Sequence, residues 1–228
     1  MLAVFLQACV TDQMTDQTVV SETPEVWAVD GIDELLPGDI LVRPNLNLLP
    51  GTAPVANGMN FGHAALVVRG YKHANPDSLL AGAIIIESIA KDVPVEFQVR
   101  QIAALAHHKL DAFNNVNFDC TKAGNRFRLR LNLPQIQLDS VIQFAVKQQG
   151  DQSSWNAAKR LPSDYQQPGK DSWADNNYWY CSLLVWQSVL AATNIDLDPN
   201  GGYMVYPNDL ISSPYFYNNS SHTGRAKF

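Results

Sequence analysis

The stretch YCSLLVWQSVLAAT, residues 180–193, predicts the centre of the fold. Its apolar residues fall on nearly every face of a helix, and a helix of this kind is usually buried on all sides. Cys181 stands at or just inside the start of that helix, directly after a cluster of aromatic residues. The sequence therefore predicts a buried helix with a thiol in its first turn, around which the other elements pack.

Short β-rich segments precede this helix in the chain. Apolar runs or alternating patterns predict strands at 40–43, 61–68, 82–88 and 126–133, with 93–99 as a further candidate. Helical spacing predicts helices at 101–113, 138–150 and 153–161, and a short helical turn at 32–36, while 69–78 is predicted to be a loop. This order predicts an α+β fold in which the buried helix packs on an antiparallel sheet.

Composition limits the class of protein. The 228 residues are 46% hydrophobic and 17% charged, which suits one well-filled globular domain. The formal net charge is −6 and no basic stripe stands out, so nucleic acid is not an expected partner. No apolar run reaches the roughly 18 residues of a membrane-spanning helix. Three cysteines (Cys9, Cys120 and Cys181) are too few and too scattered for a disulfide framework, although one Cys120–Cys181 bridge stays open.

Two polar residues at strand ends give Cys181 a chemical context. His63 opens the predicted strand at 61–68, and Glu87 closes the one at 82–88. If these strands pair antiparallel, both side chains reach the same edge of the sheet. A carboxylate there can hold one imidazole nitrogen and leave the other for a thiol, as in a catalytic triad. The start of a helix lowers a thiol pKa, so we expect Cys181 to be a nucleophile with His63 as its base.

Each of these residues also has a structural interpretation. A free cysteine in an apolar helix is usually a small buried hydrophobe, and a single histidine near a strand end is usually structural. Glu87 follows three isoleucines, so it is either solvated beyond the strand or a buried charge that needs a partner. A metal site would combine His63, Glu87 and Cys181 with His107 or His108. No HxH or HExxH spacing supports such a site, so we expect no metal.

The aromatic residues before Cys181 have two interpretations as well. They either line an acyl groove or pack in the core, and the residues concerned are Trp173, Tyr178, Trp179 and Tyr180. Trp179 and Tyr180, which stand closest to the thiol, are the predicted substrate contacts. Cys120 has no base or aromatic wall nearby in the sequence, and we expect it to be structural.

The N-terminus differs in character from the rest of the chain. Residues 1–9, MLAVFLQAC, are apolar, and residues 10–25 are polar without an apolar period. LQAC resembles a bacterial lipobox, which implies lipid on Cys9, a signal remnant at 1–9, a flexible tether at 10–25 and a lipid anchor in the bacterial cell envelope. The apolar stretch is short and no Lys or Arg precedes it, so an ordinary frayed N-terminus is the alternative.

Five segments in a fixed order carry a wider resemblance: LLPGDILVR, FGHAALVV, IIIES, NNYWYCSLLVW and VYPNDLISSP. Within about residues 34–214 they resemble the permuted papain-like amidases of the YaeF/YiiX type, relatives of the NlpC-like cell-wall peptidases. In that group the His strand precedes the Cys helix, as here. The resemblance implies a circularly permuted papain-like domain over 26–228, with a five- or six-stranded antiparallel sheet against the Cys181 helix.

The resemblance also implies roles and an activity. It makes Cys181 the nucleophile and an oxyanion donor through its backbone N–H, with His63 as base, Glu87 as orienting group and Asp39 near the site. Many members have Glu where this chain has Leu183. The implied reaction is hydrolysis of an amide or thioester through an acyl-enzyme, without a cofactor, on an envelope peptide or acyl substrate. A non-catalytic envelope binding module and an acyltransferase or lipid-directed hydrolase are the alternatives.

Overall fold

The computed structural model describes residues 25–45, 60–89, 98–105, 127–153, 178–199 and 204–216. Within them, a six-stranded sheet has the order β1-β8-β3-β4-β6-β7, and each neighbouring pair is antiparallel. The strands are β1 (Glu25–Ala28), β3 (Ile40–Pro44), β4 (Phe61–Arg69), β6 (Ile84–Ser88), β7 (Val99–Ala103) and β8 (Phe127–Arg130). The predicted α+β class and antiparallel sheet are confirmed.

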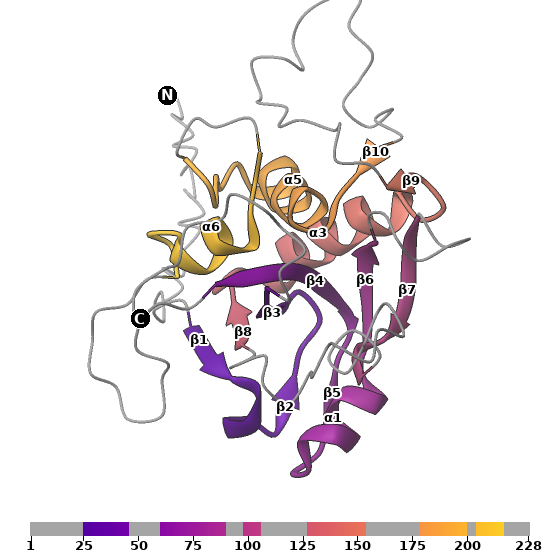
Figure 1. The fold of residues 1–228 in the computed structure, drawn as a ribbon, viewed down its shortest axis with the longest axis vertical. Helices are drawn as coiled ribbons and strands as arrows, with labels where there is room; N and C mark the ends of the chain where they lie inside the picture. The colour runs from indigo at the N-terminus through magenta and orange to yellow at the C-terminus, as the bar shows by residue number, and fades with distance from the viewer. Residues whose placement is uncertain are drawn as a thin grey trace, which may run out of the picture.

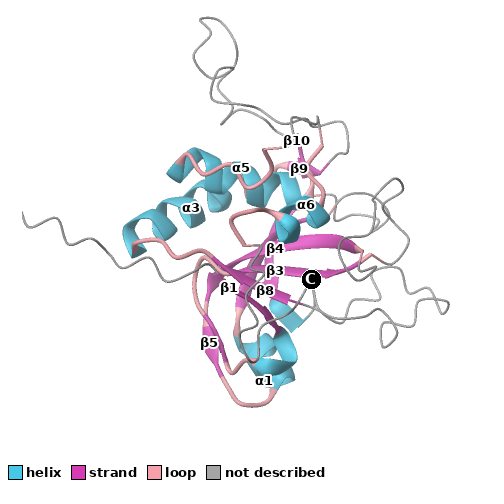
Figure 2. Ribbon diagram, turned by 90° about the vertical axis from the view of Figure 1, so that its left-hand side faces the viewer, coloured by secondary structure: helices cyan, strands magenta, loops and turns pink. Residues whose placement is uncertain are grey.

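Helices cover both faces of this sheet. Figures 1 and 2 show α3 (Gln135–Lys147), α5 (Cys181–Thr193) and α6 (Pro207–Ser212) on one side, and α1 (Pro76–Gly82) on the other. Because both faces are covered, the central strands are apolar on both sides, and this explains their continuous apolar runs. In β6, for example, Ile86 packs in the core beneath α5 and Ile85 in the core that contains the α1 leucines.

Helix α5 is buried over most of its length, as predicted. All residues from Cys181 to Leu190 are buried, and the helix packs against β4, β6, α3 and α6. It ends at Thr193, where Asn194 adopts a left-handed conformation with φ of 59° and its N–H bonds back to the Leu190 carbonyl. Its first residue, Cys181, therefore reaches the sheet from a rigid element.

Small elements complete the described part of the chain. A 3-10 turn (Val29–Gly31) leads to β2 (Glu34–Leu35), which pairs antiparallel with β5 (Tyr71–Lys72). Strand β9 (Gln152–Ser153) pairs in parallel with β10 (Tyr178–Trp179), directly before α5. Thus β9 and β10 fix the approach of the chain to Cys181.

Several predicted elements are wrong in part, each because a distant partner decides the conformation. The predicted turn at 32–36 contains β2, and the predicted loop at 69–78 contains β5 and the start of α1. Residues 101–103 of the predicted helix at 101–113 belong to β7, which pairs with β6; residues 104 and 105 are helical, and the rest lies outside the described residues. Glu25, predicted to end the tether, pairs with Arg130 as the first residue of β1.

Candidate active site

Strands β4 and β6 bring His63 and Glu87 together. They pair antiparallel, with Leu66 opposite Ile86, so that His63 and Glu87 both lie toward the same end of the ladder. The Nε2 atom of His63 lies 2.9 Å from Oε2 of Glu87, and both side chains are buried. The prediction that these two residues meet at one edge of the sheet is confirmed.

The second oxygen of Glu87 is bound by Arg100, which sequence reasoning did not single out. Arg100 stands opposite Glu87 in the β6–β7 ladder, and cross-strand partners project to the same face. Its Nε and Nη2 atoms donate to Oε1 of Glu87 at 3.2 and 3.1 Å. Glu87 is 1% exposed, so this carboxylate is a buried charge with a partner on each oxygen.

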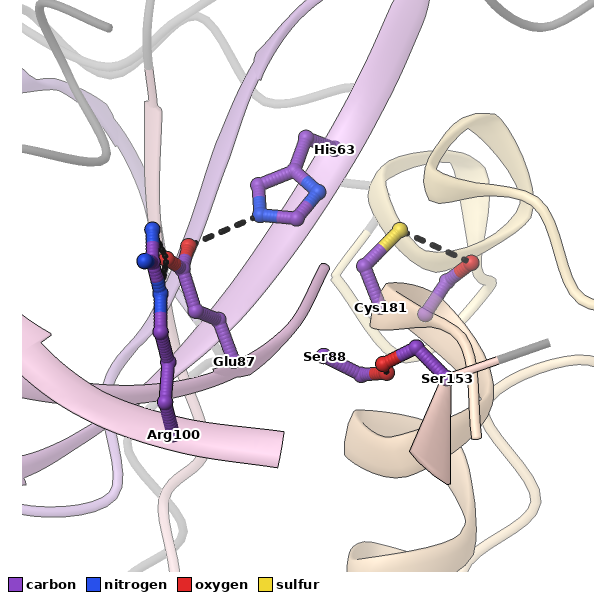
Figure 3. Close-up of polar contacts among 7 residues, drawn as sticks. His63, Glu87, Ser88, Arg100, Ser153 and Cys181 are labelled. Carbon is purple, nitrogen blue, oxygen red and sulfur yellow. Dashed lines mark hydrogen bonds and ion pairs between the residues drawn. The ribbon is translucent and has the colours of Figure 1, made fainter. Parts of the chain in front are cut away.

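These contacts select one form of the histidine. A carboxylate that receives two guanidinium hydrogen bonds is ionised and accepts only, so Nε2 of His63 donates to it. The remaining nitrogen, Nδ1, then carries a lone pair. Figure 3 shows the ring between the Glu87 carboxylate and the Cys181 sulfur, with the second nitrogen on the side of Cys181. The arrangement leaves His63 able to accept a proton on that side.

Cys181 is held against β4 at the residue next to His63. Oγ of Ser182 lies 3.9 Å from its sulfur. The backbone N–H groups of Ala64 and Ser182 are close enough to that sulfur to favour the thiolate and act to lower the pKa of the thiol. The cysteine is 3% exposed and is a free thiol. The structure therefore joins His63 of β4 to Glu87 of β6 by a hydrogen bond. It places the buried Cys181 of α5 on the other side of the histidine ring, where the sulfur contacts Ser182 (Figure 3).

Burial dominates the electrostatics of the pair. It raises the pKa of Cys181, although the N–H donors of Ala64 and Ser182 and the positive charge of Arg43 act in the opposite direction. Burial also lowers the pKa of His63 below 6.5, assisted by Arg43 and Arg100 and opposed by the bond to Glu87. The thiol pKa is raised and not lowered as expected from the helix start, because burial outweighs the nearby N–H groups and the charge of Arg43. The resting pair is a neutral thiol beside a neutral imidazole.

The residues on both sides of Cys181 are anchored to Val205. The Val205 N–H donates to Oη of Tyr180 at 2.9 Å, and Oγ of Ser182 donates to the Val205 carbonyl at 2.6 Å. Three residues later, Oδ1 of Asn208 accepts the N–H of Phe61 at 2.6 Å, at the start of β4. We call Val205 and Asn208 the C-terminal clamp, because this segment holds both the Cys helix and the His strand.

A second link joins the Glu87 strand to the approach to Cys181. The hydroxyl of Ser88 donates to the Trp179 carbonyl at 2.9 Å, and its Oγ also contacts Oγ of Ser153 at 2.5 Å. Since the Ser88 proton goes to Trp179, Ser153 is the donor in the second contact. Figure 3 shows this serine pair beneath Cys181. Ser88 and Ser153 thus connect β6, β9 and β10 at the base of the site.

Trp179 and Tyr180, predicted as substrate contacts, are core residues in the structure. Both are fully buried, Nε1 of Trp179 donates to Asp151 at 2.9 Å, and Oη of Tyr180 accepts from Val205. Their polar atoms are satisfied inside the protein, so the packing interpretation replaces the groove interpretation. Leu183 is also fully buried in the core beneath α5.

Asp39 does not lie near the site as the resemblance implied. It precedes β3 at the end far from Arg43, and its carbonyl accepts the N–H of Val67, four residues beyond His63 along β4. Its carboxylate binds Nε and Nη2 of Arg130 at 2.7 and 2.8 Å. Asp39 therefore joins the Pro-Gly-Asp turn to β8.

The described residues include only part of the predicted metal site and do not include the predicted lipid attachment site at Cys9. Within the described ranges, no group of three or more His, Cys, Asp or Glu side chains could hold a metal ion. No helix in the same ranges has the length and apolar character to cross a membrane. Several residues named in the sequence analysis lie outside the described part: Cys9, His107, His108, Cys120, Trp173 and the side chain of Tyr178.

Comparison with known proteins finds one weak likeness of note. A protein of Bacillus subtilis (strain 168) with the name "Uncharacterized protein YycO" is 30% identical over 145 residues, which cover 64% of this chain and 48% of the relative. The chain thus spans about half the length of the protein it matches. No family model matches the chain, and no solved structure does so either.

Proposed function

We propose that the protein is a cysteine hydrolase of permuted papain-like type, which cleaves an amide of a bacterial envelope substrate through an acyl-enzyme. The observation that carries the proposal is the hydrogen bond of 2.9 Å between Nε2 of His63 and Glu87, with the Cys181 thiol on the other side of the histidine ring (Figure 3). A nucleophile, a base and an orienting carboxylate from three separate elements are what thiol catalysis requires.

The chemistry follows from the neutral resting pair. As the Cys181 sulfur attacks the carbonyl carbon, a C–S bond forms and the thiol proton passes to Nδ1 of His63. In this proposal the backbone N–H of Cys181, at the start of α5, is the donor to the developing oxyanion. The C–N bond then breaks, and His63 returns the proton to the leaving amine. Water, deprotonated by His63, attacks the thioester carbon. The C–S bond then breaks, His63 returns that proton to the Cys181 sulfur, and the acid is released.

Mass spectrometry of envelope extracts tests this function. Wild type is expected to convert some amides to an acid and an amine, whose summed mass exceeds that of the amide by one water. Cys181→Ala is expected to yield no such products. Ser188→Ala, on the same buried helix but bonded to the Leu184 carbonyl, is the matched control and is expected to retain turnover. Hydrolysis by purified Cys181→Ala protein at the wild-type rate would refute the proposal.

A non-catalytic envelope binding module is the second candidate, favoured by the burial of Cys181 and His63, which are 3% and 7% exposed. Under that function, wild type and Cys181→Ala retain the same envelope component and neither converts it. An acyl adduct on Cys181, detected after a brief reaction and acid quench, is expected only of the hydrolase or of an acyltransferase. Release of that adduct to water rather than to an added amine separates those two.

The envelope location is part of the proposal through Cys9, which lies outside the described residues. Labelled palmitate is expected in the wild-type chain after expression in a bacterium and not in Cys9→Ala. Incorporation that persists in Cys9→Ala would remove the lipid anchor and leave the hydrolase proposal untouched.

A further inference from the structure

We propose that Arg100 is a positioning residue of this site, whose forked contact with Glu87 fixes His63 as a neutral base with Nδ1 open to the thiol. The inference rests on the proposed function, in which His63 is the general base. The geometry itself stands on β6 and β7, where Glu87 and Arg100 are opposite each other and share two hydrogen bonds.

Four residues form a charged row across four neighbouring strands. Arg43 on β3 stands opposite His63 on β4, and Glu87 on β6 stands opposite Arg100 on β7, so each pair projects to one face. The bond between His63 and Glu87 joins the two pairs. We call these four residues the charged row. Arg43 and Glu87 are buried, and the Arg100 side chain is 15% exposed, so the row is largely shielded from water.

Burial is the main reason that His63 stays neutral, and the two arginines of the row act in the same direction. Glu87 alone would favour an imidazolium, but Arg100 already neutralises that carboxylate, and Arg43 adds a further positive charge. A protonated His63 would therefore place a second net positive charge in a buried row, which desolvation makes unfavourable. Removal of Arg100 takes away one of those charges and leaves Glu87 free to stabilise the imidazolium.

Arg100 also fixes the direction of the carboxylate. Nε and Nη2 of Arg100 both donate to Oε1 of Glu87, which holds that oxygen on the side of β7 and leaves Oε2 for His63. A carboxylate held in this way accepts from Nε2–H and so selects the tautomer with an unprotonated Nδ1. Without the fork, Glu87 can rotate and the Nδ1–H tautomer becomes accessible.

Other elements packed on β4 add little charge near His63. Helix α5 presents Cys181, whose thiol is neutral at rest. The acidic residue of α6, Asp209, accepts the Tyr206 N–H at the start of its own helix. On α3, Asp139 accepts from Gln135, and Lys147 is exposed at the helix end. Among the described residues, Arg43, Glu87 and Arg100 are therefore the charges that act on His63, in addition to its burial.

The sheet supplies a matched control for Arg100. Arg130 on β8 donates through the same two nitrogens to the buried carboxylate of Asp39, at 2.7 and 2.8 Å. This pair is also a half-buried arginine on a buried acid, but it lies at the far end of β3 from the charged row. Loss of Arg130 perturbs the fold in the same way without touching His63.

Nuclear magnetic resonance of the full chain with ¹⁵N-labelled histidine tests the proposal. The His63 signal is identified by its absence from His63→Asn, and its ring ¹⁵N shifts report both tautomer and protonation. We expect the Nε2–H tautomer in wild type. In Arg100→Gln we expect the protonation midpoint to rise by about one pH unit, a tenfold change in proton affinity, with Nδ1–H tautomer appearing. Arg130→Gln is expected to leave the His63 signals unchanged.

The outcomes separate this inference from the proposed function. A His63 midpoint and tautomer in Arg100→Gln identical to wild type, or an equal change in Arg130→Gln, overturns the positioning role. If Arg100→Gln does not fold, Arg100→Lys carries the test, since it keeps the charge and loses the fork. The Nδ1–H tautomer in that variant supports the proposal, and wild-type signals overturn it. None of these magnetic resonance results depends on turnover. Failure of the hydrolase proposal would appear separately, as equal rates of hydrolysis by wild type and Cys181→Ala.

Discussion

The C-terminal clamp gives the sharpest prediction, because two side chains that flank Cys181 bind one residue. Tyr180→Phe removes the oxygen that accepts the Val205 N–H, and Ser182→Ala removes the hydroxyl that donates to the Val205 carbonyl. Tyr180 and Ser182 are fully buried, so water does not reach Val205 to take over the lost hydrogen bond. Each substitution leaves one backbone group of Val205 buried without that partner.

The expected magnitude follows from the cost of such a group. A buried donor or acceptor left unsatisfied costs about 1–3 kcal/mol. In a domain of this size, the thermal midpoint is then expected to fall by about 2–12 °C for each single variant. The double variant is expected to lose less than the sum, by about 0.5–3 kcal/mol, because the first substitution already releases the segment that the second would release.

Urea unfolding followed by tryptophan fluorescence measures these free energies for both single variants and the double variant. Tyr71→Phe and Ser140→Ala are matched controls, since both side chains are exposed, and we expect each to stay within about 0.5 kcal/mol of wild type. Single variants as stable as these controls, or strictly additive losses in the double variant, would show that Val205 does not anchor the two sides of Cys181.

Three further outcomes follow from the site. Burial lowers the pKa of His63 from 6.5 and raises that of Cys181 from 9.0, so the folded state binds fewer protons than the unfolded chain in acid and more in base. Thermal midpoints are therefore expected to be level between about pH 6.5 and 9 and to fall outside that window. A midpoint that rises below pH 6 would contradict the neutral His63. Glu87→Gln is expected to lower the free energy of unfolding by roughly 2–4 kcal/mol, somewhat less than for a fully buried pair because Arg100 is 15% exposed. Urea titration measures this, and a loss under about 1 kcal/mol would place the pair among weak surface contacts. Asn208→Ala is expected to cost about 1–3 kcal/mol through the Phe61 N–H and to slow turnover. An unchanged rate would separate Asn208 from the alignment of His63.

The meeting of His63 with Glu87 could be predicted because it needs only local patterns and one assumption about pairing. The strands at 61–68 and 82–88 were recognisable from their apolar runs, and antiparallel pairing then places the start of one beside the end of the other. The buried helix was recognisable for a similar reason, since a helix that is apolar on nearly every face has no side to expose.

Arg100 could not be predicted in the same way. It lies where the candidate strand at 93–99 meets the predicted helix at 101–113, and short apolar segments do not distinguish the two states. Only the β6–β7 register places it opposite Glu87. The pKa direction of Cys181 was missed although the burial of its helix was predicted, because the expectation took the effect of the helix start to be larger than the effect of burial on the thiol.

The C-terminal clamp has a consequence for biosynthesis. The contacts that align the Cys helix with the His strand come from Val205 and Asn208, which follow Cys181, His63 and Glu87 in the chain. A ribosome-bound chain that already displays those three side chains still lacks the segment that aligns them. A nascent or truncated product ending before residue 205 therefore carries the chemical groups without their alignment, so the site is completed only when synthesis has passed the clamp.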